Sequence, residues 1–392
     1  MCQSLSPTNG IPLGGEQVAR SQSADSMVEQ AALVAVRDVL GVKKGERVLI
    51  VTNPEHDVET ISRALYAQVE SQGGAPLLVV QPVKGQLDYA DPSVISALHA
   101  APEVVLSISH EKLGKDREAM ARPIRVKHRG KRRYKRYHHV FEYLMEEAKI
   151  RSFWSPGVTL DMFARTVPID YGLLQDRAAM LGNALTRAEE VSITAPGGTD
   201  LVIGLRGRRC RRDDGDFTKP GKGGNLPAGE VFISPELGSS RGTIAFDGSI
   251  SSDKGEIIIE RPIVCSVEKG FVTKVSGGTE ARRLRDTLKR SVEKARSMAS
   301  DGAITAEKGR EYQRNANNLG ELGIGLNPAA RIVGNMLEDE KAFRTCHIAI
   351  GANYDLDADA LTHLDGLIRE PTITVRYGSG RERVLLEGGA LI

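Results

Sequence analysis

The chain has 392 residues, of which 40% are hydrophobic and 27% are charged, a balance that is typical of a globular protein and excludes wholesale disorder. The formal net charge of +2 gives no overall field for nucleic acid or a membrane surface, and no apolar run approaches the ~18 residues that span a bilayer. This length exceeds a single ordinary hydrophobic core and predicts two domains.

The N-terminal residues and the cysteines bear on the cellular compartment. Residues 1–26 are polar and lack the basic-then-apolar order of a signal peptide, so we predict a disordered leader, with Met27 as an alternative start. No CxxC motif is present, which argues against a disulfide framework or a cysteine-rich zinc module and favours a cytoplasmic location. The four cysteines are Cys2, Cys210, Cys265 and Cys346.

Residues 27–188 are predicted to form an N-terminal α/β domain. Short apolar runs at Glu46–Thr52, Pro76–Gln81 and Val104–Ser109 are typical of buried strands. Helical patterns separate them, which predicts βαβ units and a mostly parallel sheet covered on both faces. Neither GxGxxG nor GxxxxGK[ST] occurs, so the sequence does not indicate a nucleotide site. The expected helices are Val58–Gln72, Pro92–Ala101 and a later one around Tyr171–Arg187.

A basic segment, residues 122–139, interrupts the α/β pattern. It holds nine Lys or Arg in eighteen residues, and Tyr134 and Tyr137 lie among them. Such a segment can bind a nucleic-acid backbone and stack its bases. Charge runs more often face water, so we favour a surface insertion that takes no part in catalysis.

Residues 189–392 are predicted to form a second domain of a different type. Short alternating strands follow one another between glycines, which is typical of antiparallel sheets. One charged helix over Glu280–Ser300 interrupts them. The change of pattern places the domain boundary near residue 188 and predicts a β-rich α+β domain.

Two histidines of this second half stand out. His347 and His363 are the only histidines after residue 139, and both lie in apolar surroundings. His363 and Asp365 are two residues apart, so in a strand their side chains project from the same face. An imidazole and a carboxylate at this spacing suit a divalent transition metal, although such a pair also occurs as a hydrogen bond within a core.

Two glutamates strengthen the case for a metal. Glu230 opens an apolar strand after a Pro-Ala-Gly turn, and Glu321 is surrounded by apolar residues and flanked by Gly320 and Gly323. A carboxylate is costly to bury unless it is paired or binds a metal. The flanking glycines allow another part of the backbone to approach closely. Singly, each glutamate also fits a turn cap or a partner of an arginine; together with the histidines they predict a metal site.

Four motifs in this order, GNLPAGEVF, ELGIGLNP, HIAIGANY and HLDG, resemble the M29 family of metallo-aminopeptidases, the aminopeptidase T and PepS type. The resemblance covers residues 190–380, and the α/β first half is compatible with it. It implies a homodimer that acts on peptides with two divalent ions (Zn, Co or Mn), held about 3.5–4 Å apart by a bridging carboxylate. The implied metal ligands are Glu230, Glu321, His347, His363 and Asp365, with Tyr354 and Glu321 in catalysis.

A second enzyme class stays open. A branch resembling these proteins contains iron(II) dioxygenases that open 2,5-dihydroxypyridine rings. His347, His363 and Asp365 alone would supply the two-His, one-carboxylate set for a single Fe(II). The presence of both Glu230 and Glu321 favours two metals, so we predict a metallo-aminopeptidase, with the dioxygenase as the alternative. A nucleic-acid-binding protein that uses residues 122–139 ranks last, because it leaves the buried carboxylates and histidines without a purpose.

Overall fold

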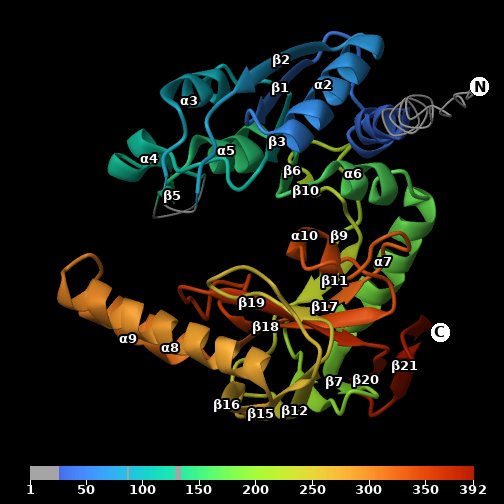
Figure 1. The fold of residues 1–392 in the computed structure, drawn as a ribbon, viewed down its shortest axis with the longest axis vertical. Coiled ribbons are helices and arrows are strands. Elements are labelled where there is room, and N and C mark those ends of the chain that lie inside the picture. The colour runs from blue at the N-terminus through green and yellow to red at the C-terminus, as the bar shows by residue number, and fades with distance from the viewer. Residues whose placement is uncertain (1–25, 86–87, 129–133) are drawn as a thin grey trace, which may run out of the picture.

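The computed structural model describes residues 26–85, 88–128 and 134–392. It has an α/β layer at one end and two antiparallel sheets at the other, with the long helix α7 (Tyr171–Arg187) running between them (Figure 1). This mixed α/β architecture confirms the predicted fold class. Residues 1–25 of the predicted leader lie outside the described residues.

The first sheet has five strands in the order β10-β6-β3-β1-β2, and every neighbouring pair is parallel. The three predicted apolar runs correspond to β1, β2 and β3, with bounds that differ by no more than one residue at either end, whereas β6 and β10 were not predicted. Helices follow the strands as βαβ units require. The strands are β1 (Arg47–Thr52), β2 (Ala75–Val80), β3 (Val104–Ser109), β6 (Arg151–Pro156) and β10 (Gly223–Asn225).

The central strands β1 and β3 are buried on both faces, which explains their unbroken apolar runs, whereas the edge strand β2 is partly exposed. Along β1, Val48 and Ile50 belong to one hydrophobic cluster, while Leu49 and Val51 belong to a second one. The first cluster includes α2 (His56–Ser71) and α6 (Leu160–Thr166), and the second includes α3 (Pro92–His99) and α5 (Val140–Tyr143). The other helical segments here are residues 26–34, the π-helices Ala35–Val39 and Leu144–Ala148, and α4 (Arg117–Ala121).

The second half is built on two antiparallel sheets that share one core. Gly366 of the seven-stranded sheet leaves room for the ring of Phe246 of the eight-stranded sheet, whose Cε1 lies 2.5 Å from where a Cβ would be. The seven-stranded sheet holds β14 (Ile257–Ile258), β13 (Ser249–Ile250), β19 (His363–Arg369), β18 (Thr345–Gly351), β17 (Leu319–Gly325), β11 (Glu230–Ile233) and β9 (Arg211–Asp213). The eight-stranded sheet holds β16 (Phe271–Ser276), β15 (Ile263–Glu268), β12 (Arg241–Phe246), β8 (Asp200–Gly204), β7 (Ala188–Thr194), β20 (Thr372–Tyr377), β21 (Glu382–Glu387) and β22 (Ala390–Leu391).

Three further helices belong to this half. The predicted charged helix is α8 (Thr279–Ser300), which packs against α9 (Ala306–Asn315) and the strands β15 and β16. The short helix α10 (Met336–Asp339) lies toward the α/β layer (Figure 1).

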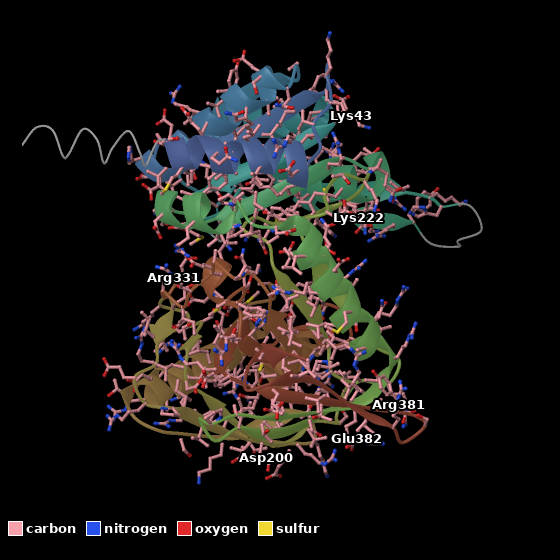
Figure 2. All side chains as sticks on the ribbon, turned by 90° about the vertical axis from the view of Figure 1, so that its right-hand side faces the viewer. Lys43, Asp200, Lys222, Arg331, Arg381 and Glu382 are labelled. Atoms are coloured by element: carbon pink, nitrogen blue, oxygen red, sulfur yellow. The ribbon has the colours of Figure 1, made fainter. Side chains whose placement is uncertain are left out.

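Charged side chains such as Lys43, Asp200 and Glu382 point outward at the two ends of the molecule (Figure 2). In the part of the chain that the structure describes, no helix is long and apolar enough to cross a membrane.

The chain crosses between the two halves after residue 188. Strand β10 lies beyond the predicted boundary, yet it pairs with β6 of the first sheet. The chain then returns to the seven-stranded sheet at β11. The boundary near residue 188 stays a prediction, and the two halves are joined at this second place as well as through α7.

The basic segment forms a small hairpin. Its strands β4 (Ile124–Val126) and β5 (Lys135–Tyr137) pair only with each other, and residues 129–133 lie outside the described residues. Most of the described side chains in it are exposed, in agreement with a surface insertion, but Tyr137 is buried. Whether the segment binds nucleic acid stays untested.

Asn327 offers a test of the contact between the halves. Its buried amide donates to the carbonyl oxygens of Thr166 in α6 and Ala228 before β11, at 3.0 and 2.9 Å. Asn327→Ala leaves both buried carbonyls without a donor, so we expect the free energy of unfolding to fall by about 1–3 kcal/mol. Urea denaturation measures this. The control Asn317→Ala, at a half-buried site, should change little; an equal loss in both variants would contradict the assignment.

Candidate metal centre

All five predicted metal ligands meet on neighbouring strands of the seven-stranded sheet. Glu230 opens β11, Glu321 lies in β17 and His347 in β18, while His363 and Asp365 both belong to β19. These strands are adjacent in the order β19-β18-β17-β11, so residues up to 135 positions apart in sequence lie side by side. His363 Nε2 is 3.2 Å from Asp365 Oδ1, which confirms that the two side chains share one face of the strand.

Glycine makes the close packing of these strands possible. A Cβ on Gly323 would lie 1.9 Å from Nε2 of His347, so any side chain there would displace the imidazole. A Cβ on Gly320 would lie 2.1 Å from the carbonyl oxygen of Ala352. The flanking glycines therefore do what the sequence predicted, since they allow neighbouring groups to approach the backbone beside Glu321.

The ligands form two groups that share one carboxylate. Glu230, Glu321 and His347 offer donor atoms within 4.8 Å of one another, and so do Glu321, His363 and Asp365. The oxygens of Glu321 divide between them, because Oε1 lies 3.2 Å from His347 Nε2 and Oε2 lies 3.4 Å from His363 Nε2. This is the arrangement of a carboxylate that can bridge two cations.

Several acceptor atoms of the cluster lack a donor. Glu230 Oε2, Glu321 Oε2 and Asp365 Oδ1 are buried without a hydrogen-bond partner. Imidazole nitrogens lie within ion-pair distance of them, at 3.2–3.4 Å, but not in the orientation of a hydrogen bond. Buried acceptors without donors are costly unless a cation completes them, so these residues fit divalent metal ions.

The ring of His363 is already oriented for such a role. Its Nδ1 lies 2.8 Å from the carbonyl oxygen of Ala352, to which Nδ1–H donates, and Nε2 therefore faces the carboxylates with its lone pair. His347 is completely buried and presents Nε2 to Glu230 and Glu321. Each of the two groups thus holds one imidazole nitrogen and carboxylate oxygens, a donor set that suits Zn, Co, Mn or Fe.

Sequence reasoning missed a buried lysine at the edge of this cluster. Lys341 is fully buried, and its Nζ lies 2.8 Å from Glu230 Oε1, in contact with Glu340, and 3.9 Å from Asp213 Oδ2. A run of four charged residues, Glu338 to Lys341, is normally exposed, so its position, with three residues between it and the apolar strand β18, was the one signal available.

The buried cluster carries more negative than positive charge. When all are ionised, its five carboxylates and the single ammonium of Lys341 leave four negative charges, the number that two divalent ions neutralise. Burial raises the pKa of Asp213 and the pKa of Glu340 to about 8. Burial alone lowers the pKa of His347, but Glu321 and Glu230 outweigh it and raise the pKa to about 9.

Tyr354 closes one side of the cluster. It follows β18, and its ring packs against Phe232 and His363 with centroids 5.1 and 5.2 Å apart. Desolvation and the nearby carboxylates raise the pKa of its hydroxyl, which therefore stays protonated and able to donate. Arg211 donates to its backbone carbonyl oxygen at 2.6 Å.

The acidic loop after Tyr354 forms ion pairs with Arg208, which lies just before β9. Arg208 lies 3.1 Å from Asp355 and 2.9 Å from Asp357.

Tyr354, Glu321 and His363 line a cleft of about 440 Å³ that Trp154 and Asn225 of the first sheet also border. The cluster is therefore reached from between the two halves of the molecule.

Comparison with known proteins places the chain in a family. A sequence model described as "NicX: 2,5-dihydroxypyridine 5,6-dioxygenase" matches residues 159–375, more than half of the 392 residues. The chain belongs to this family. A 2,5-dihydroxypyridine 5,6-dioxygenase of Pseudomonas putida is 30% identical over 132 residues, which are 33% of this chain. The match spans only 36% of that relative's own length.

Two solved structures share the fold over nearly the whole chain. The 2,5-dihydroxypyridine dioxygenase of Pseudomonas putida has a TM-score of 0.66 at 17% identity and covers 95% of this chain and 97% of its own. AmpT from Thermus thermophilus has a TM-score of 0.62 at 19% identity and covers 94% and 99%. At these identities the likeness establishes the fold, which both branches named from the sequence share.

The shared position of Glu321 predicts unequal effects of two conservative changes. Glu321→Gln removes the charge common to both ligand groups, so we expect it to lower the metal content at both. Asp365→Asn touches one group and should lose about one ion while the other stays. Metal analysis after dialysis measures both contents, with circular dichroism to verify folding. Equal loss in the two variants would contradict a bridging role.

Proposed function

We propose that this protein is a two-metal hydrolase that releases N-terminal residues from peptides. The observation that carries this proposal is the division of Glu321 between two ligand groups, Glu230–Glu321–His347 and Glu321–His363–Asp365. A two-metal peptidase needs such a shared carboxylate, whereas a mononuclear oxygenase has no use for a second group. The fold shared with AmpT from Thermus thermophilus agrees with the resemblance of the four sequence motifs to the aminopeptidase T type and supports the proposal.

The ligands and their neighbours have distinct tasks in this reaction. Glu230, Glu321, His347, His363 and Asp365 would hold the two ions. When bound, the ions lower the pKa of a water molecule and polarise the scissile carbonyl. Lys341 holds Oε1 of Glu230 at 2.8 Å, which leaves Oε2 for a metal. Glu321 lies at the centre of the site and can accept the proton that the attacking water loses.

Tyr354 completes the catalytic set. Its phenol borders the same cleft as Glu321 and His363, and its ring is fixed between Phe232 and His363. A protonated phenol donates a hydrogen bond to an oxygen that gains negative charge, as the carbonyl oxygen does when water attacks it.

The family match favours a second candidate, ring cleavage of a dihydroxypyridine by a single iron. This reaction would use His347, His363 and Asp365 as ligands. In the described residues, however, the atoms that lie within 4.8 Å of one another group His347 with Glu230 and Glu321, and group His363 with Asp365 and Glu321. The geometry therefore ranks the hydrolase first.

Tyr354→Phe tests the catalytic role of the hydroxyl. The change removes one oxygen and keeps the ring between Phe232 and His363, so metal content and fold should stay as in the wild type. We expect kcat for a dipeptide to fall by about 10²–10³, the loss typical of one oxyanion donor. Steady-state kinetics with metal-loaded protein measure it. A change confined to KM would assign the tyrosine to substrate binding instead.

Glu230→Gln separates the two candidate functions. In a two-metal peptidase we expect it to remove one ion and nearly all peptide cleavage, because Glu230 belongs to only one ligand group. A mononuclear iron enzyme would keep its iron and its oxygen consumption with 2,5-dihydroxypyridine. The wild type should cleave peptides with a free α-amino group and leave N-acetylated ones intact. Oxygen uptake with the pyridine and no peptide cleavage would overturn the proposal.

A further inference from the structure

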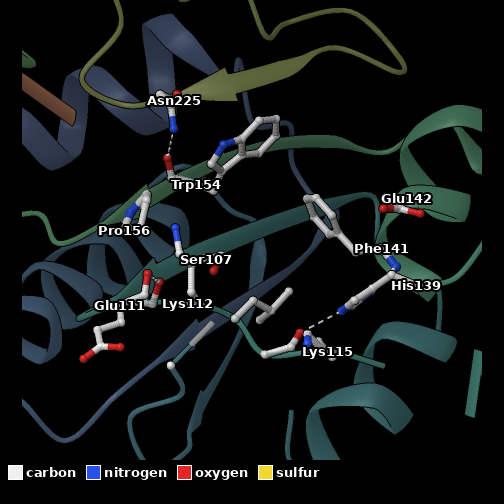
Figure 3. A pocket seen from close by; sticks show the side chains of 14 residues that line it. Ser107, Glu111, Lys112, Lys115, His139, Phe141, Glu142, Trp154, Pro156 and Asn225 are labelled. Carbon is white, nitrogen blue, oxygen red and sulfur yellow. Dashed lines mark hydrogen bonds between the residues drawn. The ribbon is translucent and has the colours of Figure 1, made fainter. Parts of the chain in front are cut away.

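A second pocket lies in the α/β layer, outside the metal centre. It has a volume of about 490 Å³, within the range of small-molecule sites, and we call it the aromatic pocket. It opens at the carboxyl ends of β3 and β6, the edge at which open parallel sheets bind their ligands. Its walls include Ser107, Leu113, Phe141, Trp154, Pro156 and Asn225 (Figure 3).

Aromatic rings dominate this pocket. Trp154 on β6 and Phe141 on α5 point toward the same space and meet edge to face, with centroids 6.0 Å apart and planes at 88° (Figure 3). Both are only half-buried, so part of each ring is free to contact a ligand. An added aromatic ring can pack against these two rings in an offset or edge-to-face arrangement, and a large apolar group can contact their faces.

Charge contributes little to what the pocket selects. Lys112 and Lys115 lie at its border together with Glu111 and Glu142, so the two signs balance. Both ring nitrogens of His139 are engaged by the backbone, because Nδ1 accepts from the Phe141 N–H at 3.0 Å and Nε2 donates to the Gly114 carbonyl oxygen at 3.0 Å. The histidine fixes the start of α5 and with it Phe141. Recognition therefore depends on apolar shape.

The aromatic pocket and the metal cleft are neighbours that share two border residues. Trp154 and Asn225 border both. Asn225 Nδ2 donates to the Trp154 carbonyl oxygen at 3.2 Å, and the two residues are paired in register across β10 and β6. A ligand whose reacting group lies at Glu321 and His363 can thus extend an adjacent side chain over Trp154.

We propose that the aromatic pocket is the substrate side-chain site, and that the substrates are peptides with an aromatic or large apolar residue beside the scissile bond. The identity of the ligand rests on the proposed peptidase function. The pocket itself, with Trp154 and Phe141 as its contact residues, is a separate statement, and it has its own measurement.

Trp154 is the only tryptophan of the chain, so its fluorescence reports directly on the pocket. Metal-loaded protein is titrated with Phe-Ala and Ala-Phe in which a reduced –CH₂–NH– bond replaces the scissile amide, and with reduced Ala-Ala as the control. We expect an aromatic peptide to change the intensity or wavelength of Trp154 emission with saturation, and Ala-Ala to leave it unchanged. Saturable binding of the aromatic peptides by calorimetry without any change in emission would overturn the pocket.

Kinetics of variants provide the second measurement. Phe141→Ala should lower the ratio of kcat/KM for the preferred aromatic peptide over Ala-Ala by about 10-fold or more, and Phe141→Leu should restore part of it. Leu173→Ala, an apolar change at an exposed site on α7, should leave the ratio as in the wild type. An unchanged ratio in Phe141→Ala overturns the pocket.

The two hypotheses fail in different ways. Emission changes with aromatic peptides but no cleavage of any peptide would support the aromatic pocket and refute the peptidase. Peptide cleavage without aromatic preference and without emission change would support the peptidase and refute the pocket.

Discussion

The structure depends on the burial of five carboxylates around one lysine. Carboxylates crowded into an apolar sheet repel one another, and the single ammonium of Lys341 cannot neutralise them all. The protein therefore folds around a charge deficit that two divalent ions can fill. Glu321 lies at the centre of this cluster, and Gly323 leaves room there for the imidazole of His347.

The chain shares its fold with a 2,5-dihydroxypyridine dioxygenase and with AmpT, and the fold alone does not decide the chemistry. The donor set therefore carries the proposed hydrolase function. Under that proposal, the second ligand group built on Glu230 would serve to activate water between two metals rather than oxygen at one. The sheet places one ligand group on each side of Glu321, because β11 and β19 lie on opposite sides of β17 and β18.

The sequence predicted the parts whose signals are local. The buried strands β1 and β3 stand out as apolar runs, and His363 and Asp365 share a face because strand geometry repeats every two residues. Lys341 was missed because a charged run normally faces water, and only the tertiary fold carries it inside. Strand β10 was missed because Gly223, Gly224 and Asn225 have no apolar side chains that could form a strand pattern. Their pairing with β6 depends on residues far away in the sequence.

That pairing has a mechanical consequence. Strand β10 is hydrogen-bonded into the first sheet, and five residues later the same chain delivers Glu230 to the metal cluster. Because this connection is short, a rotation of one half against the other would move the carboxylate of Glu230 and alter its distance from Glu321. Under the proposed two-metal function, a ligand that changes the relative position of the halves would therefore also change the position of the Glu230 carboxylate among its neighbours.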